Sequence, residues 1–303
     1  MRRVFFLAGI WGWSFLFVRV AVKGLTPTTV ACGRVLLGSA FLFIALAIRG
    51  RRVQIDRRLV KTVATMGLLS NAVPFALQAW AQHQPSMTSS LASVLNATTP
   101  IFAAVVAAVM SGDRFRRPQL GGLLLSIVGV GVAAGLSRGD LRAATILPDL
   151  AMLGSTFSYG LGFTYARIHL GPIDPMIAAA GQQIMAFGFL LPFATITSMQ
   201  HGIHLTTTRV IAMLLLGCLG TGLAWMINLG NITLLGPTKA STVTFLVPIV
   251  AVIAGVVILH EPFRVTMVIG AAIVLLGVAL IQERITARRI AVPSEADPVF
   301  LER

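Results

Sequence analysis

Long apolar runs separated by short polar connections fill almost the whole chain of 303 residues. A membrane-spanning helix needs roughly 20 consecutive, mostly apolar residues. The runs predict ten such helices, at about 4–22, 29–48, 60–80, 87–110, 119–136, 147–167, 175–197, 209–229, 238–259 and 265–282. The alternation of apolar and polar positions that is typical of membrane β-barrel strands does not occur. We therefore expect an all-α integral membrane protein.

The composition agrees with this pattern, because 56% of the residues are hydrophobic and only 11% are charged. Soluble domains carry about a quarter charged residues, and a soluble protein with this composition would expose large apolar patches. The N-terminal stretch "MRRVFFLAGIWGWSFLFVRV" begins like a signal peptide. No small-x-small cleavage site follows it and Arg19 interrupts its end, so we interpret it as a retained first helix.

The basic residues indicate how the chain is oriented in the membrane. The net charge of +14 would suggest a nucleic-acid partner in a soluble protein, but here the Lys and Arg residues lie between apolar runs. With a cytoplasmic N-terminus, 17 of the 24 Lys and Arg residues fall on the cytoplasmic side of the ten predicted helices. The positive-inside rule therefore predicts a multi-pass protein with both termini in the cytoplasm and no nucleic-acid partner.

The sequence matches itself when it is shifted by 148 residues. The coincident pairs include Gly12/Gly160, Phe15/Phe163, Arg19/Arg167, Pro100/Pro248, Gly122/Gly270 and Gly129/Gly277, and Trp11 falls opposite Tyr159. Chance similarity between apolar helices would match Leu and Val, rather than Arg, Pro and Gly at one offset. Because each unit has five helices, an odd number, the second must enter the membrane from the opposite side. We expect two inverted five-helix repeats, at residues 1–142 and 143–283, and a cytoplasmic tail at 284–303.

Several motifs together resemble one transporter family. They are "WGWSFLFVRV", "RVLLGSAFLFIAL", "SLASVLNATTPIFAAVVAAV" with "GDRF" after it, and "ASTVTFLVPIVAVIAGVVILHEPF". In combination they are similar to the drug/metabolite transporter (DMT) superfamily, EamA type, over about residues 4–283. The resemblance implies duplicated five-helix units and export of small metabolites, often amino acids, across the bacterial inner membrane. Related sequences often carry Glu just before the proline of the ninth helix, where this chain has Val247, with Thr99 opposite it in the fourth.

Polar and aromatic residues recur at helical spacing within the predicted helices, which places them on shared faces. These faces supply the candidate substrate-binding residues Trp11, Ser14, Asn71, Phe75, Gln78, Ser93, Asn96, Tyr159, Trp225, Asn228 and Thr244. A polar side chain at membrane depth must face protein or a water-filled cavity. The amides therefore line a central cavity or, alternatively, hold helices together, and the hydroxyls can instead bond their own helix. Tyr159 and the Trp residues are alternatively anchors at the membrane interface.

Pro100 and Pro248 occupy equivalent positions in the fourth and ninth predicted helices. Proline removes a backbone hydrogen bond and bends a helix. We interpret the pair as matched bends that shape or gate the cavity, and the alternative is a plain packing kink.

Charged residues limit the substrate. No Asp or Glu lies centrally in a predicted helix, which argues against a carboxylate proton relay and favours a neutral or zwitterionic solute. Arg19, Lys23 and Arg34 cluster near the predicted outer ends of the first two helices. We expect them to snorkel to the membrane surface, and the alternative is that they attract a carboxylate in an outer vestibule.

The sequence predicts a secondary transporter, an exporter of a small neutral or zwitterionic metabolite such as an amino acid, which works by alternating access around a central cavity. The alternatives are a non-transporting membrane assembly protein, an intramembrane enzyme or a passive channel. No catalytic constellation, metal-ligand cluster or phosphate-binding loop is present, so we expect no enzymatic activity, no catalytic residue, no metal and no cofactor. The expected partners are a small-molecule substrate and the lipid bilayer, with the protein a monomer or homodimer.

Overall fold

The computed structural model describes residues 2–50, 55–111, 117–135, 143–171, 173–231 and 243–290, and every regular element in these ranges is helical. The first half contains α1 (Arg2–Ala21), α2 (Pro27–Ile48), α3 (Arg57–Gly67), η1 (Leu68–Ala72), α4 (Val73–His83), α5 (Ser89–Asn96), α6 (Thr99–Ser111) and α7 (Arg117–Ala134). The second half contains α8 (Ala143–His169), α9 (Pro175–His201), α10 (Thr207–Leu214), η3 (Leu215–Leu223), α12 (Val243–Leu259) and α13 (Val265–Ile290).

These elements make ten spans in the described ranges. Three spans are composite: α3, η1 and α4 form one continuous span over Arg57–His83, α5 and α6 form another, and α10 and η3 continue as helix to Asn231. The ten predicted helices and the all-α class are confirmed, with boundaries that agree to within a few residues. Some helices extend further than predicted, such as α13, which continues to Ile290.

The spans have the length and the surface of a membrane protein. Within the described residues, seven helices are long and apolar enough to cross a membrane, and two shorter apolar helices cover Phe245–Leu259 and Val265–Ile281. The remaining span, α8, has 27 residues but carries Asp149 and several hydroxyl side chains. Large apolar side chains such as Ile44, Leu124 and Phe193 are exposed on the outside of the bundle. Such side chains are stable there when lipid surrounds them, so the protein is a multi-pass membrane protein.

Polar caps fix where several spans begin. The side-chain oxygens of Thr26, Asp56, Thr88, Asp174 and Thr206 accept hydrogen bonds from the first free backbone N–H groups of α2, α3, α5, α9 and α10. An N-cap satisfies a donor that has no partner within its own helix. Each cap stands at the junction between an apolar run and a short connection, which explains why the chain turns there.

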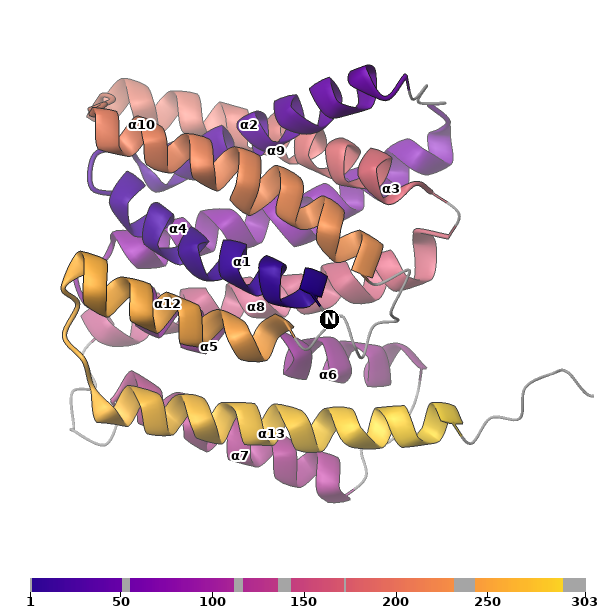
Figure 1. Ribbon diagram of the computed structural model, residues 1–303, viewed down its shortest axis with the longest axis vertical. Helices are drawn as coiled ribbons and strands as arrows, with labels where there is room; N and C mark the ends of the chain where they lie inside the picture. The colour runs from indigo at the N-terminus through magenta and orange to yellow at the C-terminus, as the bar shows by residue number, and fades with distance from the viewer. Residues whose placement is uncertain are drawn as a thin grey trace, which may run out of the picture.

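Close glycine contacts show how the two halves pack. Helices α7 and α13 lie side by side at one end of the bundle (Figure 1). A Cβ atom added to Gly122 would lie 2.7 Å from the carbonyl oxygen of Gly277, and one added to Gly270 would lie 2.6 Å from that of Gly129. Shifting the first contact by 148 residues, with the halves exchanged, gives the second. The two helices are therefore packed symmetrically along their length.

The same exchange relates other contacts between the halves. Helix α1 packs on α12, where Gly12 lies against the backbone of Ala251, and α8 packs on α6, where Gly160 lies against the backbone of Ala103. Both residues of the second contact differ from those of the first by 148 positions. A pseudo-two-fold axis therefore relates the two halves, and with five spans in each half the repeat is inverted. The exact boundaries of the two repeats stay a prediction.

Two features depart from regular α-helix. The π-helical segments η1 and η3 occupy corresponding places in the third and eighth spans. The fourth span is interrupted at Ala97 and Thr98, just before Pro100, whereas α12 runs continuously through Pro248. The two prolines are therefore equivalent in position, but within the residues that the structure describes a helix interruption lies next to Pro100 and none lies at Pro248. Their role in bending or gating stays a prediction. Irregular turns of this kind often mark functional sites in helices.

Candidate substrate-binding site

A cavity lies at the centre of the bundle, between the two halves. It is lined by Trp11, Ser14, Phe15, Arg34, Phe75, Gln78, Asn96, Thr99, Tyr159, Phe163, Trp225 and Val247. These residues come from α1, α2, α4, α5, α6, α8, the helix that follows η3, and α12. The space not filled by atoms is about 600 Å³, part of it open to solvent.

Five aromatic rings form a connected wall. The ring centroids of Phe75 and Tyr159 lie 6.3 Å apart, and those of Tyr159 and Phe163 lie 5.8 Å apart. Phe163 lies 5.8 Å from Trp225, which in turn lies 6.2 Å from Trp11. Most of these pairs meet edge to face, the arrangement that aromatic quadrupoles favour. The wall offers flat apolar faces together with the polar edges of Tyr and Trp.

The wall follows the pseudo-two-fold symmetry. Trp11 and Tyr159 are equivalent under the 148-residue shift, as are Phe15 and Phe163, and Phe75 corresponds to Trp225 at a shift of 150. Two glycines in the same spans show the same shift of 150: Gly67 packs closely against α9, and Gly217 packs closely against α2. The cavity is therefore built around the axis that relates the halves.

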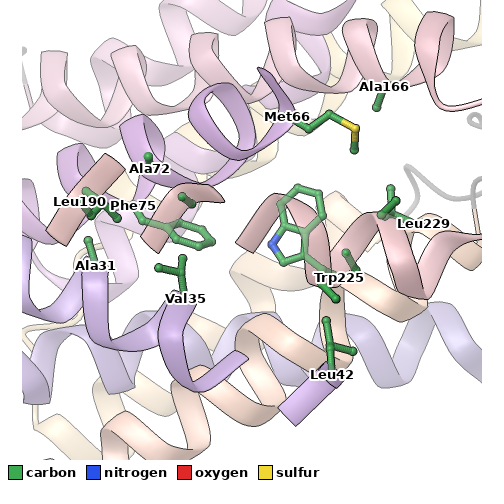
Figure 2. Packing of buried hydrophobic residues seen from close by; sticks show 14 of the residues in the cluster. Ala31, Val35, Leu42, Met66, Ala72, Phe75, Ala166, Leu190, Trp225 and Leu229 are labelled. Carbon is green, nitrogen blue, oxygen red and sulfur yellow. The ribbon is translucent and has the colours of Figure 1, made fainter. Parts of the chain in front are cut away.

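Helix α2 supports two of these rings from outside the cavity. Phe75 and Trp225 are buried in one hydrophobic cluster. Figure 2 shows Phe75 beside Ala31 and Val35, and Trp225 close to Leu42 on the same helix. Rings packed in this way keep fixed positions, because interiors are close-packed and a ring cannot turn without displacing its neighbours. The aromatic wall is therefore preorganised.

Arg34 of α2 enters the cavity and corrects one expectation. Its side chain is 4% exposed, and its guanidinium carbon lies 3.6 Å from the centroid of the Phe75 ring. Its Nε atom donates a hydrogen bond of 3.0 Å to Oγ1 of Thr221 in η3. The expected snorkelling to the surface is thus wrong for Arg34. Because α2 begins at Pro27, Arg34 lies about two turns inside the span, and its head group points sideways into the bundle.

The other two basic residues of the predicted cluster do not line the cavity. Arg19 donates from Nη1 to the carbonyl oxygens of Gln82 and Gln84, the latter at 3.1 Å. It thereby ties α1 to the end of α4. Lys23 is exposed. Of the three, only Arg34 can meet a ligand in the cavity.

The hydroxyl groups and the amides in the cavity differ in their bonding. Oγ of Ser14 donates to the carbonyl oxygen of Ile10 at 2.9 Å, and Oγ1 of Thr99 donates to that of Asn96 at 2.8 Å. By contrast, the buried Oδ1 of Asn96 has no hydrogen-bond partner in the described part of the chain. A buried polar atom without a partner carries a free-energy cost that a bound ligand removes. The Asn96 side chain thus keeps unused hydrogen-bonding capacity beside the cavity.

The structure brings together most of the predicted site residues. Seven of them line the cavity: Trp11, Ser14, Phe75, Gln78, Asn96, Tyr159 and Trp225. Three do not, namely Asn71, Ser93 and Asn228, which are buried elsewhere in the bundle. Oγ of Ser93 donates to the carbonyl oxygen of Ser90, in its own helix. The side chain of Thr244 lies outside the described residues. The roles of all these residues in substrate binding stay predictions.

Five lining residues were not among the predicted site residues: Phe15, Arg34, Thr99, Phe163 and Val247. The sequence holds a signal for two of them, because Phe15 and Phe163 coincide in the repeat and follow Trp11 and Tyr159 by one helical turn. Arg34 carries no such signal, since its repeat partner Gln182 is a different kind of residue. The sequence alone did not place it in the cavity.

Comparison with known proteins agrees with this architecture. The model of the EamA-like transporter family matches residues 4–135 and 146–282, one match in each half. The chain is 23% identical over 269 residues to the Uncharacterized transporter YoaV of Bacillus subtilis (strain 168), covering 89% of this chain and 91% of that protein. It is 28% identical over 260 residues to the Uncharacterized inner membrane transporter YedA of Escherichia coli (strain K12), covering 83% and 80%.

The fold also has a counterpart among solved structures. One crystal structure aligns with a TM-score of 0.62 over 95% of this chain and 97% of that one, at 19% sequence identity. Identity this low shows a shared fold and nothing more. The ten-span arrangement is therefore one that another protein adopts.

Proposed function

This chain belongs to the EamA-like transporter family, and from that premise we propose that it is a secondary transporter that exports a small neutral or zwitterionic metabolite, such as an amino acid. The observation that carries the proposal is the polar and aromatic cavity on the pseudo-two-fold axis between the halves. Inverted halves can exchange conformations, which makes the inward-open and outward-open states similar in energy. Transport then proceeds by alternating access around the cavity.

The lining of the cavity supports the substrate class. None of its described lining residues is Asp or Glu, so the cavity offers no fixed negative charge to a cationic drug or metal ion. Flat rings, two amides and one guanidinium instead suit a solute with an apolar body and polar groups. The absence of a carboxylate at Val247 and Thr99 fits the same substrate class, because both of these residues line the cavity.

The proposed orientation places both termini in the cytoplasm of a cell with an inner membrane. The excess of Lys and Arg on that side supports it. The relative YedA is described as an inner membrane transporter. Export follows from the resemblance to the metabolite exporters of the superfamily.

A two-stage experiment tests this function. Cells that overproduce the protein are first screened for tolerance to toxic amino acids and their analogues. Each compound that gives tolerance is then measured in counterflow with the purified protein in liposomes. We expect saturable counterflow, which a passive channel would not give. The variant Val247→Trp, which fills the cavity, should abolish counterflow while the protein still elutes as a folded species. Absence of transport over the whole panel would contradict the proposal.

A further inference from the structure

The central cavity contains one charged side chain among its described lining residues, that of Arg34. None of the described residues forms an ion pair with it. Three of the described carboxylates are occupied elsewhere: Asp56 caps α3, Asp174 caps α9, and Glu261 accepts hydrogen bonds from Ser89 and Ser90. A fourth, Asp149 of α8, does not line the cavity. A charge that is 96% buried and unpaired is strongly unfavourable, because removing an ion from water costs more than the protein dipoles return. Such a charge calls for a counter-ion.

The guanidinium is positioned with its binding edge free. One face lies on the Phe75 ring and Nε is occupied by Thr221, which itself donates to the carbonyl oxygen of Leu216 at 2.9 Å. The two terminal nitrogens of Arg34 donate no hydrogen bond to any described residue, and neither is among the fully buried atoms that lack a partner. They therefore face the open space of the cavity. Two parallel N–H groups at this edge match the two oxygens of a carboxylate.

The repeat shows that packing does not require the charge. The residue equivalent to Arg34 in the second half is Gln182. Their backbones make equivalent contacts: a Cβ on Gly217 would lie 3.2 Å from the carbonyl oxygen of Arg34, and one on Gly67 would lie 2.5 Å from that of Gln182. The same helix packing thus accommodates a neutral amide, which does not line the cavity. The arginine is an asymmetric addition to an otherwise symmetric site.

On the basis of the proposed transport function, we infer that Arg34 is the anion-binding residue of the cavity and that the transported molecule carries one carboxylate on an apolar body. One arginine balances one negative charge. The apolar body lies against the ring wall of Trp11, Tyr159 and Trp225, which stacks flat groups. An ammonium group on the same molecule is tolerated, because ring faces attract cations. Zwitterions that carry a carboxylate, which belong to the proposed substrate class, and monocarboxylates, which extend it, are therefore substrates. Amides and amines that lack the carboxylate are not.

The test uses four probes that share a phenyl body: phenylacetate, phenylacetamide, L-phenylalanine and L-phenylalaninamide. Binding to the purified full chain is followed by tryptophan fluorescence, to which Trp11 and Trp225 in the cavity contribute, and transport by counterflow in liposomes. We expect each carboxylate to bind about 10- to 100-fold more tightly than its amide, the range for a hydrogen bond to a charged group. In Arg34→Gln, which installs the residue of the second half, this preference should disappear.

Two further variants keep the test decisive. Arg34→Lys retains the charge but loses the fork and the stacking on Phe75, so it should keep the carboxylate preference with weaker binding. If Arg34→Gln does not fold, Arg34→Lys takes its place in the comparison with the wild type. Arg57→Gln removes an exposed arginine of α3 that is not part of the cavity, and it should leave binding and counterflow unchanged.

The outcomes separate the two proposals. Counterflow that is equal for carboxylates and amides, or equal in wild type and Arg34→Gln, overturns the role of Arg34 and leaves transport standing. Carboxylate-selective binding that is lost in Arg34→Gln, without counterflow of any compound, overturns transport and supports the anion site. A wild-type protein that binds none of the four probes overturns the inferred apolar carboxylate class.

Discussion

At the scale of single residues, the polar side chains in the cavity divide according to whether the protein already satisfies them. Ser14 and Thr99 donate to carbonyl oxygens of their own spans, so they add shape but little binding capacity. Asn96 and Arg34 keep polar atoms without partners in the described part of the chain. A ligand gains free energy chiefly from groups of the second kind, because it replaces no existing bond.

Asn96→Ala is therefore expected to weaken transport with little effect on folding. The loss of one neutral hydrogen bond should raise the KM of counterflow about 2- to 12-fold, while the melting temperature changes little. Gln182→Ala is the matched control, since Gln182 is a buried amide outside the cavity lining. Its KM should equal that of the wild type. If Asn96→Ala instead lowers the melting temperature and leaves KM unchanged, Asn96 holds helices together and does not bind substrate.

At the scale of elements, hydropathy was sufficient to place the spans, but helical periodicity was not sufficient to orient every side chain. Asn71 and Gln78 are seven residues apart, which puts them on one face of a regular α-helix. Asn71 lies within the π-helical segment η1, however, whereas Gln78 lies beyond it in α4. A π-helical turn holds more residues than an α-helical turn, so the face shifts between the two. Gln78 reaches the cavity and Asn71 does not.

The internal repeat helps to predict cavity-lining residues that helical periodicity alone does not identify, but only where both halves carry similar residues. Trp11 and Tyr159 could be predicted together because each supports the other. Arg34 and Gln182 differ in charge, so neither residue supports a prediction for the other. How deep Arg34 lies in the membrane can be stated only when the start of α2 at Pro27 is known. Moving a helix boundary by one or two residues changes how deep in the membrane a nearby arginine lies. Helix boundaries are the least certain part of a prediction from sequence.

Helices α7 and α13 offer a prediction about packing between elements. Gly122→Ala places a methyl group 2.7 Å from the backbone of Gly277, which cannot move aside as a flexible side chain would. The two helices must separate, at a cost of about 1–3 kcal/mol. The adjacent variant Gly121→Ala meets no atom within 4 Å and serves as the control. Thermal unfolding of the purified protein should show a lower melting temperature for Gly122→Ala alone. Equal melting temperatures for the two variants would contradict the close packing.

At the scale of the whole molecule, one carboxylate joins the two halves at the end of the bundle that is predicted to be extracellular. Glu261 follows α12 and accepts hydrogen bonds from the backbone N–H groups of Ser89 and Ser90, at 2.7 Å and 3.1 Å, and from Oγ of Ser90 at 2.6 Å. A negative charge at the N-terminus of α5 is stabilised by the helix dipole. If alternating access separates α12 from α5 at this end, these bonds break.

Glu261→Gln should therefore favour the outward-open state. A neutral amide cannot accept charge-assisted bonds, and loss of the dipole interaction is worth about 0.3–2 kcal/mol, or about a 2- to 30-fold shift in population. With Cys32 and Cys218 replaced by Ser, a cysteine at the cavity residue Ser14 reports the opening. A membrane-impermeant thiol reagent added to intact cells should label Ser14→Cys faster when Glu261→Gln is also present.

Asp56→Asn is the matched control for this measurement. Asp56 also caps a helix, with Oδ1 accepting from the N–H of Leu59 at 2.6 Å. It lies at the end of the third span that is remote from α5, and it bonds no second helix among the described residues. Loss of the Asp56 carboxylate should leave the labelling rate of Ser14→Cys unchanged, because this cap does not hold the two halves together. If Glu261→Gln and Asp56→Asn label Ser14→Cys at the same rate, the bonds from Glu261 to α5 stabilise one helix and do not govern access to the cavity.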